Sequence, residues 1–138
     1  VLAAALYIGY ARRAFELALA YVKQREQFGR PIGSFQAISH RLADLATEIE
    51  LTRLFVYDVA DRVDSNPDEL FPREASMAKL KTTELAKRAS LEGMQMMGGY
   101  GYATEYDMER LVRATLVGTI AGGTSEIQRD IIAKTYGL

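Results

Sequence analysis

The chain has 138 residues, of which 49% are hydrophobic and 25% are charged, which is the balance of an ordinary globular domain. The formal net charge of −1 excludes a strong long-range attraction to nucleic acid or to an anionic membrane. Because there is no cysteine, neither a disulfide framework nor a thiolate metal site can form. We therefore expect a single domain over residues 1–138, large enough to bury its own core.

The first segment, from Val1 to about Gln27, is rich in Ala, Leu and Tyr and predicts a long, mostly buried helix. Its apolar start is too short to span a bilayer and lacks the basic stretch of a signal peptide. The run begins with neither Met nor a capping residue, so we expect the helix to start upstream of Val1. Gly29, Pro31 and Gly33 then predict a loop.

The second segment shows steps of three and four residues between apolar positions over about four heptads, which predicts a helix packed nearly parallel to its neighbours. Ser34 is its predicted N-cap. His40 lies one place off the stripe, and without a second His or a Cys we expect a packed or partly exposed side chain, not a metal ligand. The stripe consists of Phe35, Ile38, Leu42, Leu45, Ile49, Thr52, Val56, Val59 and Val63.

The third helix is predicted from Pro72, which suits a first helical turn, to about Met97. Small side chains recur along it and allow neighbouring helices to approach closely; they are Ala75, Ala78, Thr82, Ala86, Ala89 and Gly93.

A glycine-rich loop is predicted at 98–102, a shorter helix at 105–114, a break at 118–123 and a last helix at 125–136. Ser125 and Gln128 have capping-box spacing, and Gly137 is the predicted helix stop. No segment shows strand alternation. We therefore predict an all-α fold, an antiparallel up-down bundle of the four-helix type with a short extra helix near the C-terminus.

Two glycine-rich junctions are the candidate binding features. Gly122–Glu126 opens a helix, where free N–H groups and the helix dipole favour an anion, although plain capping explains the same residues. Gly98–Gly101 follows a helix, not a strand, so it is no dinucleotide fingerprint and is explained as a helix stop. Arg25 complements the dipole at a helix end. These features alone predict no reaction.

The joint pattern of Arg25–Gly29, Phe35-Gln36, Leu42–Asp44, Gln95–Tyr102 and Gly123–Arg129 closely resembles the C-terminal helical domain of acyl-CoA dehydrogenases. The likeness covers essentially the whole chain. It implies a longer parent enzyme with an N-terminal helical domain and a middle β domain, assembled as a dimer or tetramer. It also implies location in the bacterial cytoplasm or the mitochondrial matrix, with the cytoplasm favoured.

The resemblance implies FAD as cofactor and assigns residues to it. Arg25 and Phe28 would contact the flavin cofactor, with Arg25 near the pyrophosphate and Gln36 close by. The remaining implied contacts are Gln95, Gly98 and Gly99 to the ADP part from the neighbouring subunit, Thr124, Ser125 and Glu126 at the flavin, and Gly122 and Gly123 at the substrate.

The implied reaction converts an acyl-CoA into the 2,3-enoyl-CoA by removal of an α-proton and transfer of a β-hydride to FAD, with electrons passing to an electron-transfer flavoprotein. Many family members place the catalytic Glu where this chain has Gly122, so we expect no catalytic base within these residues. Isovaleryl-type and long-chain-type members carry the base on the first helix of this domain, at a position that falls just before Val1.

Three hypotheses follow. The chain is part of an active dehydrogenase whose base lies upstream, or a non-catalytic subunit in a mixed oligomer, or a helical interaction module. The two glycine-rich junctions count against the interaction module, because a heptad pattern without them would support helix association equally well. We expect the isolated 138 residues to be inactive and to self-associate through exposed apolar surface.

Overall fold

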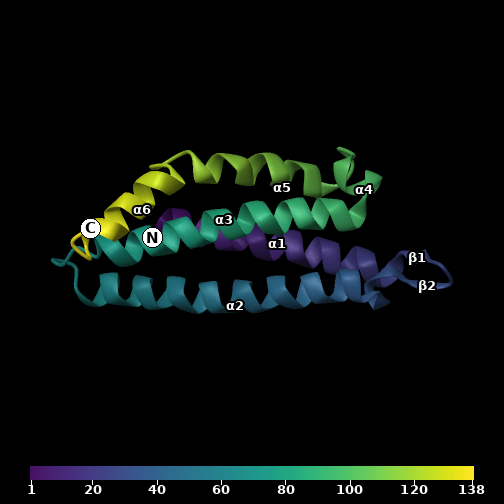
Figure 1. Cartoon of the computed structure of the whole chain (residues 1–138), viewed down its shortest axis with the longest axis horizontal. Coiled ribbons are helices and arrows are strands. Elements are labelled where there is room, and N and C mark those ends of the chain that lie inside the picture. Colours follow the sequence, from purple (N-terminus) through teal and green to yellow (C-terminus); the bar gives the residue numbers. More distant parts are fainter.

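The computed structural model describes all 138 residues, and its helices alternate in direction along one long axis (Figure 1). Three long helices, α1 (Leu2–Gln24), α2 (Gln36–Ser65) and α3 (Pro72–Met97), are followed by a return path made of two short ones, α5 (Asp107–Leu116) and α6 (Ser125–Lys134). Because α5 and α6 follow one another along α3, together they take the fourth position of the bundle. The predicted all-α up-down bundle is confirmed.

Small side chains on α1 and α3 let these two helices pack closely. On α3, Ala78, Ala86 and Ala89 are fully buried, as the sequence predicted. At Gly93, a Cβ atom would lie only 2.6 Å from Cε of Met108 in α5, so a larger residue would have to displace the end of this methionine side chain. On α1 the buried small residues are Ala4, Ala11, Ala14 and Ala18.

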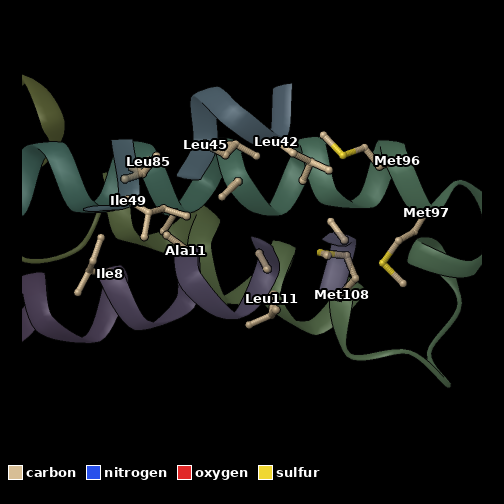
Figure 2. Close-up of a cluster of buried hydrophobic side chains, with 14 of the residues drawn as sticks. Ile8, Ala11, Leu42, Leu45, Ile49, Leu85, Met96, Met97, Met108 and Leu111 are labelled. Atoms are coloured by element: carbon tan, nitrogen blue, oxygen red, sulfur yellow. The ribbon is translucent and has the colours of Figure 1, made fainter. Parts of the chain in front are cut away.

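Larger apolar side chains from four helices fill the centre of the bundle (Figure 2). Leu42, Leu45 and Ile49 of α2 lie against α3, and Met108 and Leu111 of α5 are fully buried on the other side. The predicted stripe of α2 is buried from Leu42 to Val59, whereas its ends, Phe35, Ile38 and Val63, are only partly buried.

Two predictions near the first loop are wrong. Helix α1 ends at Gln24, and the chain turns into a two-residue antiparallel hairpin, β1 (Glu26–Gln27) and β2 (Arg30–Pro31). A 3-10 turn, η1 (Ile32–Ser34), follows it. Ser34 is not the N-cap of α2, because that position is Phe35 and the Ser34 hydroxyl donates to the Pro31 carbonyl oxygen at 2.7 Å.

The C-terminal junctions also differ in detail from the prediction. Residues Gly99–Tyr102 form one helical turn, α4, where a loop was predicted. A 3-10 turn, η2 (Val117–Thr119), extends α5, and Thr124, not Ser125, is the N-cap of α6. The predicted stop at Gly137 has φ +79°, a left-handed conformation that suits glycine. No helix is both long and apolar enough to cross a membrane.

Candidate functional site

The C-terminal ends of α1 and α3 meet at one end of the bundle and line a cavity of about 680 Å³. Arg25 and Gln27 line it from the hairpin side, and Gln95, Gly98 and Gly99 line it from the end of α3 and the start of α4. The structure therefore brings together four of the residues that the sequence assigned to a cofactor.

The side chain of Arg25 is exposed and forms no ion pair within the chain. Its backbone is held on both sides, because its N–H donates to the Tyr21 carbonyl at 2.9 Å and its carbonyl accepts from the Ile32 N–H at 2.8 Å. Tyr100 forms part of the wall, with ring centroids 5.8 Å from Tyr21 and 5.4 Å from Tyr106. A fixed backbone with a free guanidinium beside aromatic rings is suited to an anionic ligand with a flat ring.

Of the three glycines at this junction, the fold requires glycine at two positions and not at the third. Gly98 has φ +59°, which other residues rarely adopt. At Gly101 a Cβ atom would lie 2.9 Å from the Met94 carbonyl oxygen, so packing requires glycine there. Gly99 has neither constraint, since its φ is ordinary and no atom lies within 4 Å of a Cβ built on it. The fold therefore does not explain Gly99, and its bare backbone faces the cavity.

The hairpin carries Phe28 outward. Its side chain is 92% exposed, and its φ of +55° is rare for a large residue. It touches the edge of Phe35, with the ring centroids 6.1 Å apart, and the Arg30 guanidinium lies 3.9 Å from the Phe35 ring centre. Gln36, the first residue of α2, is exposed. Neither Phe28 nor Gln36 lines the cavity that contains Arg25.

The start of α6 forms a second cavity, of about 510 Å³, against the middle of α3. The predicted residues Thr124, Ser125 and Glu126 all line it, whereas Gly122 and Gly123 precede it on the chain and do not. Three cationic side chains also line the cavity: Lys87, Arg88 and Arg129. Glu84 and Glu126 line it as well, and both arginines form ion pairs with glutamates, so Lys87 is the lining cation without an ion pair. Together with the helix N-terminus, Lys87 favours an anion.

Hydrogen bonds at the start of α6 show which residue caps it. The Thr124 hydroxyl accepts from the Ile127 N–H at 3.3 Å. The pKa of Glu126 lies below its ordinary value because its carboxylate accepts from its own N–H and from the Thr124 hydroxyl. The Ser125 hydroxyl is buried and has no hydrogen-bond partner within the chain.

Lys79 holds the segment that leads into α6, and the sequence did not predict this contact. It lies on α3, is only 9% exposed, and donates from Nζ to the carbonyl oxygens of Gly118 at 2.9 Å and Gly123 at 2.6 Å. Burial lowers its pKa, and Glu84 partly opposes this shift. No sequence pattern signals such a contact, because the acceptors are backbone atoms 39 and 44 residues away.

The two cavities share no lining residue. Arg88 of the second and Gly98 of the first are ten positions apart in sequence, so the sites lie roughly 15 Å apart along α3. The structure thus unites Arg25 with Gln95, Gly98 and Gly99, and keeps Thr124, Ser125 and Glu126 at a separate place on the same chain.

No carboxylate takes the place of the missing glutamate at position 122. Gly122 has φ +66° and no atom within 4 Å of a built Cβ, so the position is open. The nearby Glu84 is paired with Arg129 at 2.7 Å, and Glu126 has a lowered pKa. The lowered pKa of Glu126 makes its carboxylate a weak proton acceptor.

Comparison with known proteins decides the family. The model of the acyl-CoA dehydrogenase C-terminal domain matches residues 1–137. The chain belongs to the acyl-CoA dehydrogenase family. A probable acyl-CoA dehydrogenase of Bacillus subtilis is 48% identical over 131 residues, which cover 95% of this chain and 34% of that protein. The chain therefore spans about a third of the length of the curated relatives it matches.

Two further similar proteins have names that mention a reaction partner or a cofactor. The CarC subunit of the caffeyl-CoA reductase–Etf complex of Acetobacterium woodii is 41% identical over 126 residues, covering 91% of this chain and 33% of that protein. The structure of the FAD complex of PigA has a TM-score of 0.91 at 33% identity, covering 98% of this chain and 35% of that one. The fold is thus shared with a solved FAD complex, and the sequence is similar to that of a subunit of a reductase complex.

Proposed function

We propose that this chain is the C-terminal domain of a flavin-dependent enzyme that interconverts an acyl-CoA and its 2,3-enoyl-CoA, acting as a dehydrogenase. The observation that carries the proposal is the shared cavity of Arg25, Gln95, Gly98 and Gly99, residues from two distant segments. The match to the C-terminal domain over residues 1–137 and the acyl-CoA dehydrogenase relatives support it.

The first cavity is the proposed site for the ADP part of FAD. The free Arg25 guanidinium would pair with a pyrophosphate oxygen, and the Gln95 amide would hydrogen-bond a polar edge of the ligand. Gly99 fits this assignment, because its backbone is open to the cavity and a ligand could approach it closely. Phe28 would contact the cofactor from the exposed tip of the hairpin, and Gln36 would approach it from α2.

The second cavity is the proposed site for the flavin end of a cofactor. Thr124, Ser125 and Glu126 offer the N–H groups of a helix start. The open space at Gly122 would leave room for the thioester substrate, which Gly123 would approach with its backbone. Because Arg25 and Gln95 line one cavity, they would hold the same FAD molecule. We propose that the two cavities of one chain serve different FAD molecules in a homo-oligomer.

When bound, FAD would accept a hydride from the β-carbon. This domain would bind and orient the cofactor, while the α-proton would be taken by a carboxylate. Gly122 cannot take it, so we propose that the base stands just before Val1. The same absence of a carboxylate favours the second candidate, a non-catalytic subunit of a mixed oligomer. The isolated chain is proposed to be inactive in either case.

Two partners and a location are also proposed. An electron-transfer flavoprotein would take up the electrons; the relative of Acetobacterium woodii is named as part of an Etf complex. A second copy of this chain would cover exposed apolar side chains, among them Leu6 at 52% and Leu51 at 64% exposure. Relatives named as bacterial and as mitochondrial proteins support the bacterial cytoplasm, which we favour, or the mitochondrial matrix.

The test is anaerobic addition of acyl-CoA thioesters of several chain lengths to the longer protein that carries this domain. We expect the flavin absorbance to bleach and mass spectrometry to find the enoyl-CoA. A flavin-loaded protein that no acyl-CoA reduces, and no enoyl-CoA reoxidises, would instead support the non-catalytic subunit. Replacing a Glu found just before Val1 by Gln separates the two candidates further, since only the enzyme would lose activity.

A further inference from the structure

Lys79 ties together both ends of the segment that joins α5 to α6. A single ammonium group donates to the Gly118 carbonyl, at the end of the α5–η2 path, and to the Gly123 carbonyl, just before the cap of α6. Neither acceptor is an acid, so the buried charge is balanced by backbone dipoles. A simple packing role would not need a lysine here, because an apolar side chain would cost less to bury.

The bond to the Gly123 carbonyl fixes the direction of one peptide plane. In a trans peptide the C=O and the next N–H point to opposite sides, so the Thr124 N–H points away from Lys79. That N–H has no acceptor within the chain, and Thr124 lines the second cavity. Gln128 assists from α6, with Nε2 at 3.2 Å from the Gly122 carbonyl and 3.4 Å from the Gly123 carbonyl.

We propose that Lys79 is a positioning residue that orients the Gly123–Thr124 peptide so that its N–H group is presented to the ligand of the second cavity. The assignment rests on the proposed function for the identity of that ligand, but not for the orientation itself. Gly123 has φ +88°, a conformation that suits glycine, and the lysine holds the peptide that follows it in one direction.

The first test uses the 138-residue chain and amide NMR. Lys79→Met removes the donors and keeps the length of the side chain, so we expect changed amide shifts at Gly123, Thr124 and Ser125. Lys81→Met, two residues along α3 and outside both cavities, is the control and should leave these amides unchanged. Lys79→Gln, which keeps a donor for one carbonyl, should give an intermediate change.

The absence of cysteine permits a rescue. Lys79→Cys can be alkylated in the unfolded state with bromoethylamine, which rebuilds a side chain of lysine length with an ammonium end. We expect this protein to recover the native amide shifts at Thr124. Unchanged amides in the Met and Gln variants would overturn the proposal. So would changes spread evenly over the chain that alkylation fails to reverse, because they indicate general packing.

The second test measures flavin affinity in the longer protein that carries this domain. Loss of hydrogen bonds from a charged donor predicts a dissociation constant for FAD that is about tenfold higher in Lys79→Met and unchanged in Lys81→Met. Altered amides with unchanged FAD affinity would overturn the role in ligand presentation. If the unaltered protein binds no flavin, the proposed function fails, and the amide experiment alone decides the orientation.

Discussion

The hydroxyl oxygens of Ser90 in α3 and Thr115 in α5 lie 2.7 Å apart, and neither residue has any exposed surface. Each hydroxyl also lies within hydrogen-bond distance of a carbonyl in its own helix, Lys87 at 3.0 Å and Val112 at 3.1 Å. Helices α3 and α5 are therefore joined by a buried polar contact whose members are all satisfied.

We expect Ser90→Ala and Thr115→Val each to lower the free energy of unfolding by about 1 kcal/mol. The double variant should lose less free energy of unfolding than the two single variants lose together, because the second change removes a group already deprived of its partner. Urea denaturation of the native chain, the two single variants and the double variant measures the coupling between the two hydroxyls. Strict additivity would show that the contact does not join α3 to α5 energetically.

The next prediction concerns Gly118, which packs against Tyr7 of α1. A Cβ atom at position 118 would lie 2.5 Å from Cε1 of the Tyr7 ring, so we expect Gly118→Ala to cost about 1–3 kcal/mol of stability. The cost should shrink when Tyr7→Leu removes the ring. Gly9→Ala on exposed α1 backbone is the control, since no atom lies within 4 Å of its built Cβ and the change should stabilise the helix. Equal thermal shifts for both alanines would contradict the packing argument.

We expect Glu48 of α2 to make the stability of the chain depend on pH. Its pKa lies below the ordinary 4.5 because of hydrogen bonds from Lys81 and then Arg88 of α3, which outweigh its partial burial. The folded pKa is therefore lower than the unfolded one. The carboxylate contributes stability above pH 4.5 and loses it as the pH falls through the folded pKa.

Glu48→Gln should reduce stability at neutral pH by about 1 kcal/mol or less, and the difference from the native chain should vanish in acid. Denaturant midpoints between neutral and acidic pH give the comparison. Glu16→Gln, in an exposed ion pair with Arg12, is the matched control with little effect at any pH. A Glu48 difference that persists in acid would show that the ion pairs are not its cause.

Removal of the two neighbouring hydroxyls at the start of α6 should change the stability of the chain in different ways. Thr124 caps the helix, so Thr124→Ala should cost about 0.5–2 kcal/mol. The Ser125 hydroxyl is buried without a partner, so Ser125→Ala should cost little or stabilise the chain. Thermal unfolding of both variants checks this order. A larger loss of stability in Ser125→Ala than in Thr124→Ala would support Ser125 as the N-cap, as the sequence predicted.

Gly99 gives a prediction that separates binding from stability. Because no fold constraint requires glycine there, Gly99→Ala should leave the thermal stability of the chain unchanged or slightly raised. In the longer protein that carries this domain it should weaken FAD binding, since the added methyl group enters the first cavity. Titration with FAD, set beside Gly9→Ala, measures the effect, and full affinity in the Gly99 variant would contradict the assignment of this cavity.

The helices could be predicted from the sequence because their signals are local. The spacing from Leu42 to Val59 predicted the buried face of α2, and the small residues of α3 predicted close packing. The end of α1 could not be predicted as well, since Arg25 and Gln27 are good helix formers and the turn depends on the left-handed backbone of Phe28 and Gly29.

The site was predictable in its parts and not in its arrangement. The resemblance assigned Arg25 and Gly99, but their shared cavity follows from the alternating helix directions, which bring the ends of α1 and α3 together. The α6 cap shifted by one residue because Thr124 and Ser125 are both good caps, and Gln128 turned to the Gly122 carbonyl. Lys79 was beyond prediction, since its acceptors carry no side-chain signature.

Flavin content tests the central claim most directly. The longer protein that carries this domain, purified and stripped of small molecules, should show a flavin absorption spectrum or regain one with added FAD, at about one FAD per chain. Arg25→Ala should lower that occupancy, because the free guanidinium is the cation of the first cavity. A purified protein that contains no flavin and takes up none would contradict the account.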